Sequence, residues 1–143
     1  MKLILNNLTD TKKLAKQLVK DLGGLSANGA TVLGLVGPLG AGKTTLVQYL
    51  AKELNVKQIV NSPTFVLLKE YPLVGSWKKL IHIDAYRLGS AEALVDIGLR
   101  DYLADPKNFI VIEWADKVKK ILPQQTVWLA LSLNKQKRQV IWR

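Results

Sequence analysis

The chain has 143 residues, of which 48% are hydrophobic and none is cysteine. This length and apolar content fit one compact domain over residues 1–143 and exclude a disordered chain, a disulfide scaffold and a cysteine-based zinc site. The net charge of +10 attracts anions such as nucleotides, RNA or an acidic protein face, and no apolar run could span a bilayer, so we expect a cytoplasmic protein.

The first half of the chain predicts a helix, a strand and a second helix. The first helix is expected to open near Thr9 to Thr11, where side chains can cap it, and to end at Gly23-Gly24. Residues 31–36 form a short apolar run typical of a strand buried on both faces of a parallel sheet. A glycine-rich turn follows this strand, and leucines four residues apart predict a helix over 43–54.

The second half predicts further strands and short helices. Residues 65–71 and 80–84 are expected to be antiparallel strands, since only a short turn joins them. The fold class is therefore α/β, with a mixed sheet, flanking helices and antiparallel hairpins. The other expected elements are helices at 91–97, at 99–104 and from 116, a strand at 109–113, and strands at 127–133 and 140–142 joined by a turn over 134–139.

A phosphate-binding motif lies between the first predicted strand and the second predicted helix. Gly37 to Thr44 matches G-x-x-x-x-G-K-[ST] at every fixed position, in the strand–turn–helix context that this motif requires. Its glycines let successive backbone N–H groups point at phosphate oxygens, and Lys43 adds a cation that we expect to be catalytic. The residues expected to contact ATP here are Gly37, Pro38, Leu39, Gly40, Ala41, Gly42, Lys43, Thr44 and Thr45.

Two carboxylates are candidates to complete a Mg²⁺ site with the Thr44 hydroxyl. Asp84 and Glu113 each end a hydrophobic strand, where strand ends converge on a phosphate loop. Both are predicted as metal-binding and catalytic residues. The pattern leaves open which one contacts the metal and which one orients water.

Three later motifs follow the phosphate loop in a specific order. They are Ser62-Pro63-Thr64-Phe65, His82-Ile83-Asp84-Ala85-Tyr86-Arg87-Leu88 and Ile112-Glu113-Trp114. With them, the sequence resembles the TsaE family (also called YjeE or YdiB), the bacterial ATPases of tRNA threonylcarbamoyladenosine biosynthesis. The resemblance covers nearly the whole chain. Two departures are Pro38, where the family usually has an acidic residue, and Ala115-Asp116, which replaces a common Pro-Glu.

The resemblance implies a function that depends on partners. It implies that ATP hydrolysis supports repeated turnover of a TsaB–TsaD complex, with tRNA contacted indirectly or weakly. Family positions for metal binding and catalysis map onto Thr44, Asp84 and Glu113. The switch-like segment maps onto 62–65, in which Thr64 would sense the γ-phosphate. Further nucleotide contacts implied by the resemblance are Thr11 and Arg138 beside adenine and Trp114 after the glutamate.

Several alternatives stay open on the sequence alone. The chain could be a small-molecule kinase, or an adaptor in which ATP sets conformation without essential hydrolysis. Trp114 could cover the nucleotide or only pack, and His82 is expected to make a structural hydrogen bond rather than transfer protons. No Gln or Arg is obviously placed to orient water, so hydrolysis by the chain alone should be slow.

Overall fold

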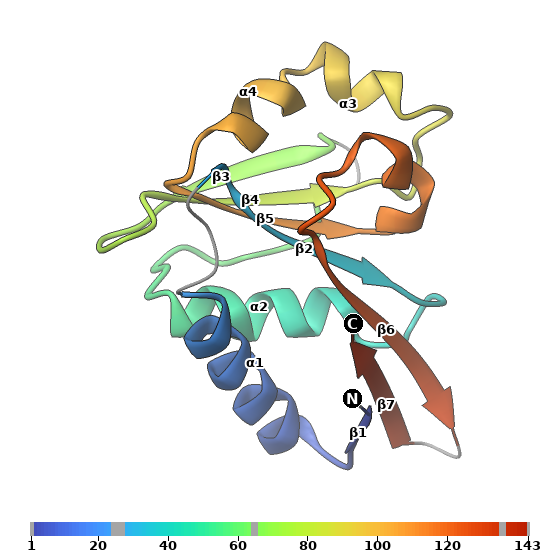
Figure 1. The fold of residues 1–143 in the computed structure, drawn as a ribbon. Coiled ribbons are helices and arrows are strands. Elements are labelled where there is room, and N and C mark those ends of the chain that lie inside the picture. Colours follow the sequence, from blue (N-terminus) through green and yellow to red (C-terminus); the bar gives the residue numbers. More distant parts are fainter. Residues whose placement is uncertain (1, 24–27, 64–65, 135–136, 143) are drawn as a thin grey trace.

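The computed structural model describes residues 2–23, 28–63, 66–134 and 137–142, and in them seven strands form one mixed sheet (Figure 1). The strand order is β1-β7-β6-β2-β5-β4-β3, in which β6, β2, β5 and β4 run parallel and the outer strands pair antiparallel. The predicted α/β class with a mixed sheet is therefore confirmed. The strands are β1 (Lys2–Leu5), β2 (Thr31–Val36), β3 (Leu68–Pro72), β4 (Lys79–Asp84), β5 (Asn108–Glu113), β6 (Val127–Asn134) and β7 (Lys137–Trp142).

Helices cover the two faces of this sheet in separate groups (Figure 1). The first group packs on the sheet face formed by Leu33, Leu35 and Val111, and the second packs on the opposite face, which includes Val32 and Ile110. None of the helices among the described residues is long and apolar enough to cross a membrane. The first group is α1 (Leu8–Leu22) and α2 (Lys43–Glu53), and the second is α3 (Glu92–Asp96), α4 (Leu99–Ala104) and the 3-10 helix η1 (Ala115–Ile121).

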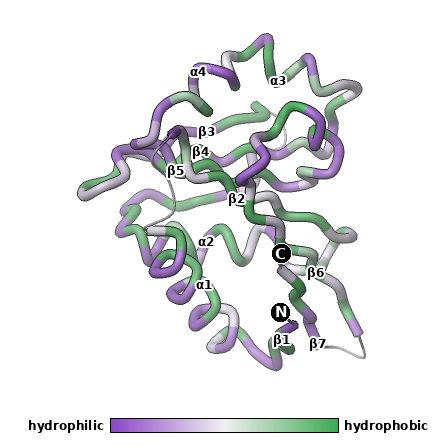
Figure 2. Tube along the Cα trace, in the orientation of Figure 1, coloured by the Kyte–Doolittle hydropathy of each residue, from purple (hydrophilic) through white to green (hydrophobic). Residues whose placement is uncertain are grey.

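The central strand β2 is buried on both faces because its side chains alternate between the two helix groups. Figure 2 shows the resulting hydrophobic stretch at the middle of the sheet, and the mixed colouring of the amphipathic α1. The chain leaves β2 at its carboxyl end and enters α2 through the glycine-rich loop. The ends of β5 and β4 lie beside this point, since β5 pairs with β2 and β4 pairs with β5. The topology therefore brings three strand ends to the start of α2.

The start of α1 corrects the predicted cap. The helix begins at Leu8, and the Asn7 side chain accepts a hydrogen bond from the Asp10 backbone N–H at 2.9 Å. The Asp10 carboxylate in turn accepts one from the Asn6 N–H at 2.9 Å. Thr9 to Thr11 thus lie inside the first turn, because this reciprocal cap starts the helix one to three residues earlier than expected.

One strand was not predicted, and two predicted strands were wrong in their extent. No strand was expected before α1, but β1 pairs with β7 at the edge of the sheet. β3 begins at Leu68 rather than at 65, because Leu67 has a left-handed φ of 66° and donates its N–H to the Pro63 carbonyl at 2.7 Å. β7 begins at Lys137, since Asn134 pairs with Lys137 in the β6–β7 hairpin.

Candidate nucleotide-binding site

The loop between β2 and α2 needs glycine at its first position. Gly37 has φ 144°, and a Cβ added there would lie 2.2 Å from the Leu131 carbonyl oxygen of β6. Gly42, at the start of α2, has φ 101°, and its Cα faces the Arg138 side chain. Among the described residues, no side chain caps this helix. The first N–H groups of α2 are therefore open to an anion, as in phosphate-binding loops.

Two backbone carbonyl groups of the loop hold the Lys43 side chain in place. Its Nζ donates to the carbonyl oxygens of Gly37 at 2.6 Å and Pro38 at 2.9 Å. The same Nζ lies 4.1 Å from the centre of the Trp114 ring, in a cation–π contact. Burial lowers the pKa of this ammonium from its ordinary value, while the nearby carboxylates of Glu113, Asp84 and Asp116 act in the opposite direction.

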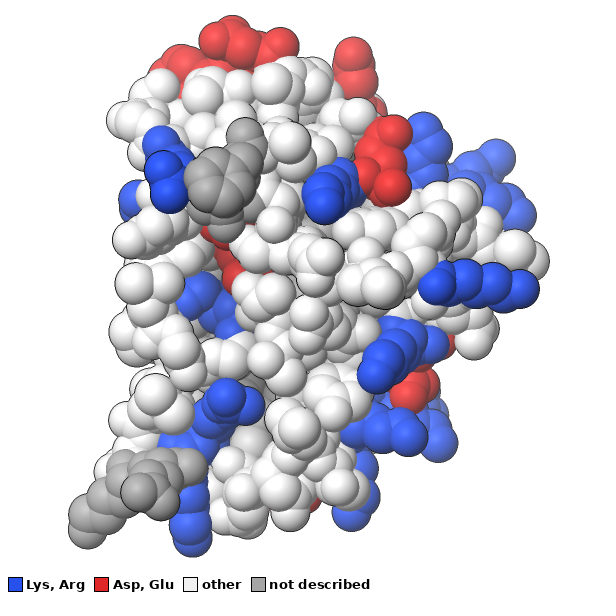
Figure 3. Space-filling view, turned by 180° about the vertical axis from the view of Figure 1, so that it is seen from behind, with Lys and Arg blue, Asp and Glu red and all other residues white. Residues whose placement is uncertain are grey.

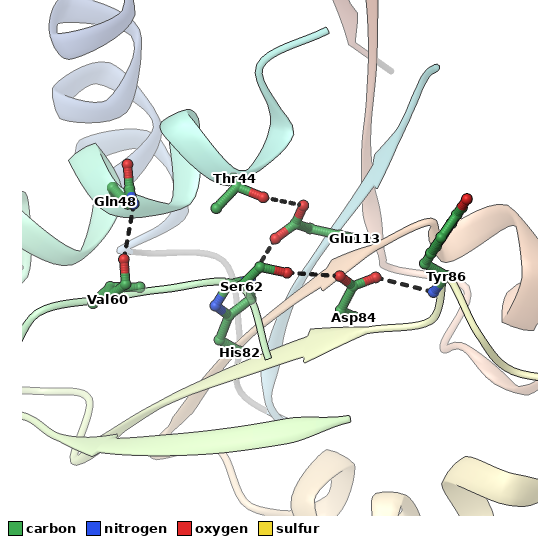
Figure 4. Close-up of polar contacts among 8 residues, drawn as sticks. All are labelled: Thr44, Gln48, Val60, Ser62, His82, Asp84, Tyr86 and Glu113. Carbon is green, nitrogen blue, oxygen red and sulfur yellow. Dashed lines mark hydrogen bonds and ion pairs between the residues drawn. The ribbon is translucent and has the colours of Figure 1, made fainter. Parts of the chain in front are cut away.

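Glu113 joins α2 to the neighbouring strands. At the end of β5, its Oε1 accepts a hydrogen bond from the Thr44 hydroxyl at 2.7 Å, and its Oε2 lies 2.6 Å from Nε2 of His82 (Figure 4). Glu113 and His82 are buried. The structural hydrogen bond expected of His82 is therefore made with Glu113.

Asp84 has a different set of contacts at the end of β4. Its Oδ2 accepts a hydrogen bond from the Ser62 hydroxyl at 2.9 Å, and its Oδ1 accepts one from the Tyr86 backbone N–H at 2.9 Å (Figure 4). Ser62 belongs to the predicted switch-like segment, of which Thr64 and Phe65 lie outside the described residues. Asp84 thus connects the sheet to that segment rather than to Thr44.

Trp114 faces Lys43 of the phosphate loop, and its backbone has an unusual conformation. It has a left-handed φ of 59°, which is uncommon for a bulky residue. The Tyr86 ring lies 5.0 Å from the Trp114 ring, and Lys117 donates to the Tyr86 carbonyl at 2.5 Å. Trp114 therefore packs against Tyr86 and Lys43 and lines the cavity, and its predicted contact with the nucleotide stays a prediction.

These residues surround a cavity of about 310 Å³. Figure 3 shows the molecule from this side, with charged side chains recessed among uncharged ones. The predicted residues that line it are Leu39, Gly40, Gly42, Lys43, Thr44, Thr45, Asp84, Glu113, Trp114 and Arg138. Ser62 and Tyr86 also line it and were missing from the predicted contacts, although both belong to motifs visible in the sequence.

The other predicted contacts lie behind or outside this lining. Gly37 and Pro38 contribute the carbonyl oxygens that hold Lys43, and Ala41 of the same loop is fully buried. Thr11 is buried in α1, and its hydroxyl has no hydrogen-bond partner among the described residues. Its predicted contact with adenine stays a prediction, as does that of Thr64.

The oxygen atoms of this site suit a hard cation such as Mg²⁺. A hydroxyl and a carboxylate oxygen lie 2.7 Å apart on the wall, at Thr44 and Glu113. Within the described residues, no three His, Cys, Asp or Glu side chains group closely enough to hold a metal by themselves. Mg²⁺ needs no such group in a nucleotide site, since substrate phosphates and waters complete its octahedron.

Comparison with known proteins assigns the chain to a family. The sequence model described as "Threonylcarbamoyl adenosine biosynthesis protein TsaE" matches residues 5–140. The chain belongs to the TsaE family. The resemblance seen in the sequence motifs is therefore confirmed.

Individual relatives agree with this assignment. The "tRNA threonylcarbamoyladenosine biosynthesis protein TsaE" of Haemophilus influenzae is 38% identical over 116 residues, which are 81% of this chain and 69% of that protein. The protein of the same description from Bacillus subtilis is 36% identical over 125 residues, 87% of this chain and 73% of its own length. The crystal structure of Bacillus subtilis YdiB superposes with a TM-score of 0.74 at 30% identity, covering 99% of this chain and 83% of that one.

The two departures from the usual TsaE pattern fit the geometry. Pro38 contributes its carbonyl oxygen to Lys43, and any residue supplies that group. Ala115 is fully buried, and its Cβ lies 3.1 Å from where a Cβ on Gly34 of β2 would stand. A small residue at 115 therefore lets η1 approach the central strand closely.

Proposed function

We propose that this TsaE-family chain binds ATP with Mg²⁺ at the cavity and hydrolyses it as a component of tRNA threonylcarbamoyladenosine biosynthesis. The observation that carries the proposal is the pairing of Thr44 with Glu113 beside the loop that holds Lys43. Together they bring hard oxygen ligands and a cation to one end of an uncapped helix. The names of the relatives supply the biological process.

Lys43 would bring its charge to the β- and γ-phosphate oxygens. The carbonyl groups of Gly37 and Pro38 fix the direction of its side chain before the nucleotide arrives. A positioned lysine loses less conformational entropy when it binds phosphate. Burial lowers the pKa of this ammonium, so a phosphate beside it would stabilise its charged form.

The contacts of the two carboxylates favour different roles. Glu113, which accepts the Thr44 hydrogen bond, would hold Mg²⁺ together with that hydroxyl. Bound Mg²⁺ would neutralise charge on the phosphate oxygens. Asp84 lines the same cavity but contacts Ser62 instead, so it would orient the attacking water or accept its proton.

Arg138 also lines the cavity. Its Cδ and Nε would be 3.1 Å from a Cβ placed on Gly42, so the side chain covers the start of α2 rather than the carboxylates. We infer that Arg138 contacts the bound ATP, beside adenine as the family resemblance implies. The partners we infer are a TsaB–TsaD complex, with tRNA touched indirectly or weakly.

Titration calorimetry tests nucleotide binding directly. ATP injected into the chain with Mg²⁺ should give saturable heat, and Lys43→Ala should weaken binding at least about tenfold, because a charge-assisted contact to phosphate is lost. Lys52→Ala is the matched control, since Lys52 lies on the exposed side of the same helix. Absence of heat for the wild-type chain, or equal affinity of the Lys43 and Lys52 variants, would reject the proposal.

A further inference from the structure

His82 lies behind the proposed metal ligand and outside the cavity. It points to the same side of β4 as Asp84, two residues further on, and its side chain has no exposed surface. The residues that line the cavity among those described do not include it. It can therefore affect the site only through another residue.

His82 contacts Glu113, and Glu113 in turn contacts Thr44. We propose that His82 is a positioning residue, which holds the Glu113 carboxylate in the rotation that presents Oε1 to Thr44 and to Mg²⁺; this rests on the proposed function. A carboxylate can only accept, so the Nε2–H of His82 donates to Oε2 at 2.6 Å. With Oε2 held, Oε1 remains on the Thr44 side at 2.7 Å.

The second ring nitrogen of His82 also supports a positioning role. Nδ1 of His82 is buried and has no hydrogen-bond partner among the described residues. The ring is thus anchored to the site through Nε2 alone. A histidine that served only the packing of β4 would gain nothing from a polar ring, because the neighbouring Leu80 and Ile81 fill their positions with apolar side chains. Groups that orient a metal ligand in this way typically change metal affinity 10–100-fold when removed.

Two amide substitutions separate the ring nitrogens. Gln reaches about as far as Nε2 of histidine, whereas Asn reaches only about as far as Nδ1. The probe is Mn²⁺, titrated into the chain with ADP and followed by electron paramagnetic resonance. We expect His82→Asn to weaken Mn²⁺ binding about 10–100-fold and His82→Gln to stay within about threefold of wild type. ATP turnover at limiting Mg²⁺ should follow the same order.

A strand variant and a double variant exclude a purely structural effect. Leu80→Ala opens a cavity on the same face of β4, so it should lower the melting temperature and leave Mn²⁺ affinity within about twofold. In a Glu113→Gln background, His82→Asn should change Mn²⁺ affinity less than about twofold, because the residue through which it acts is already altered.

Each contrary result has a distinct meaning. Unchanged Mn²⁺ affinity in folded His82→Asn, additive effects with Glu113→Gln, or a His82→Gln variant that fails to keep wild-type affinity overturns the positioning role. The comparison of His82→Gln with the wild-type chain tests the positioning role even when His82→Asn does not fold. A wild-type chain that binds no Mn²⁺ with ADP and no ATP rejects the proposed function itself, which separates the two failures.

Discussion

At the scale of single residues, the two carboxylates differ by their hydrogen-bond partners. Asp84→Asn keeps size but removes the basic oxygen, so turnover should fall at least about 100-fold while Mg²⁺–ATP affinity stays within about threefold. Glu113→Gln should instead raise the Mg²⁺ concentration for half-maximal binding at least about tenfold, because Thr44 loses its charged partner. Steady-state kinetics and calorimetry over a range of Mg²⁺ concentrations measure both.

Asp116→Asn is the control for general electrostatics. Asp116 is exposed and acts on the charge of Lys43, but it does not line the cavity. Asp116→Asn should change turnover and the Mg²⁺ concentration for half-maximal binding less than about twofold, because interactions between exposed charges are weak. If Asp84→Asn altered the Mg²⁺ requirement and Glu113→Gln altered only turnover, the two roles would have to be exchanged.

The sequence predicted that these carboxylates lie at strand ends, but not which of them contacts Thr44. Each ends an apolar strand, which local patterning reveals. Which one meets Thr44 depends on strand order: β5 pairs directly with β2, whereas β4 lies one strand further away. Strand order is set by contacts between distant parts of the chain, so no local pattern contains it. The same holds for the contact between His82 and Glu113.

At the scale of elements, the loop before α2 depends on its closeness to β6. Gly37→Ala would place a Cβ 2.2 Å from the Leu131 carbonyl oxygen at a φ of 144°, so unfolding free energy should fall by about 2–4 kcal/mol. Gly40→Ala is the control: its φ is 78°, but nothing lies within 4 Å of the added carbon. It should cost about 1–2 kcal/mol. Urea denaturation compares them, and equal losses would show that contact with β6 is unimportant.

Long or fully buried elements were predictable, and short edge elements were not. β2 and β5 are continuous apolar runs because both of their faces are covered. β1 has only four residues, and only Leu5 of them is buried, so it carries little hydrophobic signal. The early part of β7 is polar where the hairpin extends beyond the helices, which hid its start at Lys137.

At the scale of the whole molecule, charge is distributed unevenly. Acidic side chains gather at the end formed by α3 and α4, whereas basic side chains dominate the remainder of the face in Figure 3. The exposed side of α1 adds Lys12, Lys13, Lys16 and Lys20. Such an asymmetric field orients an approaching partner and speeds association at low salt. The basic surface therefore suits a partner with an acidic face.

The composition of the cavity wall predicts that a partner accelerates hydrolysis. Among the described lining residues, Arg138 is the only arginine, it covers Gly42 rather than the carboxylates, and there is no glutamine. Turnover by the chain alone should therefore be slow, on the order of 10⁻³ to 10⁻² s⁻¹, since an arginine that reaches the γ-phosphate in addition to the loop lysine is worth several orders of magnitude. Adding a TsaB–TsaD pair should raise phosphate release at least about tenfold, and the same mixture with Lys43→Ala controls for contaminating ATPases. Fast turnover without the partner would mean that the residues already present complete the site, and slow turnover with no gain would mean that this partner does not complete it.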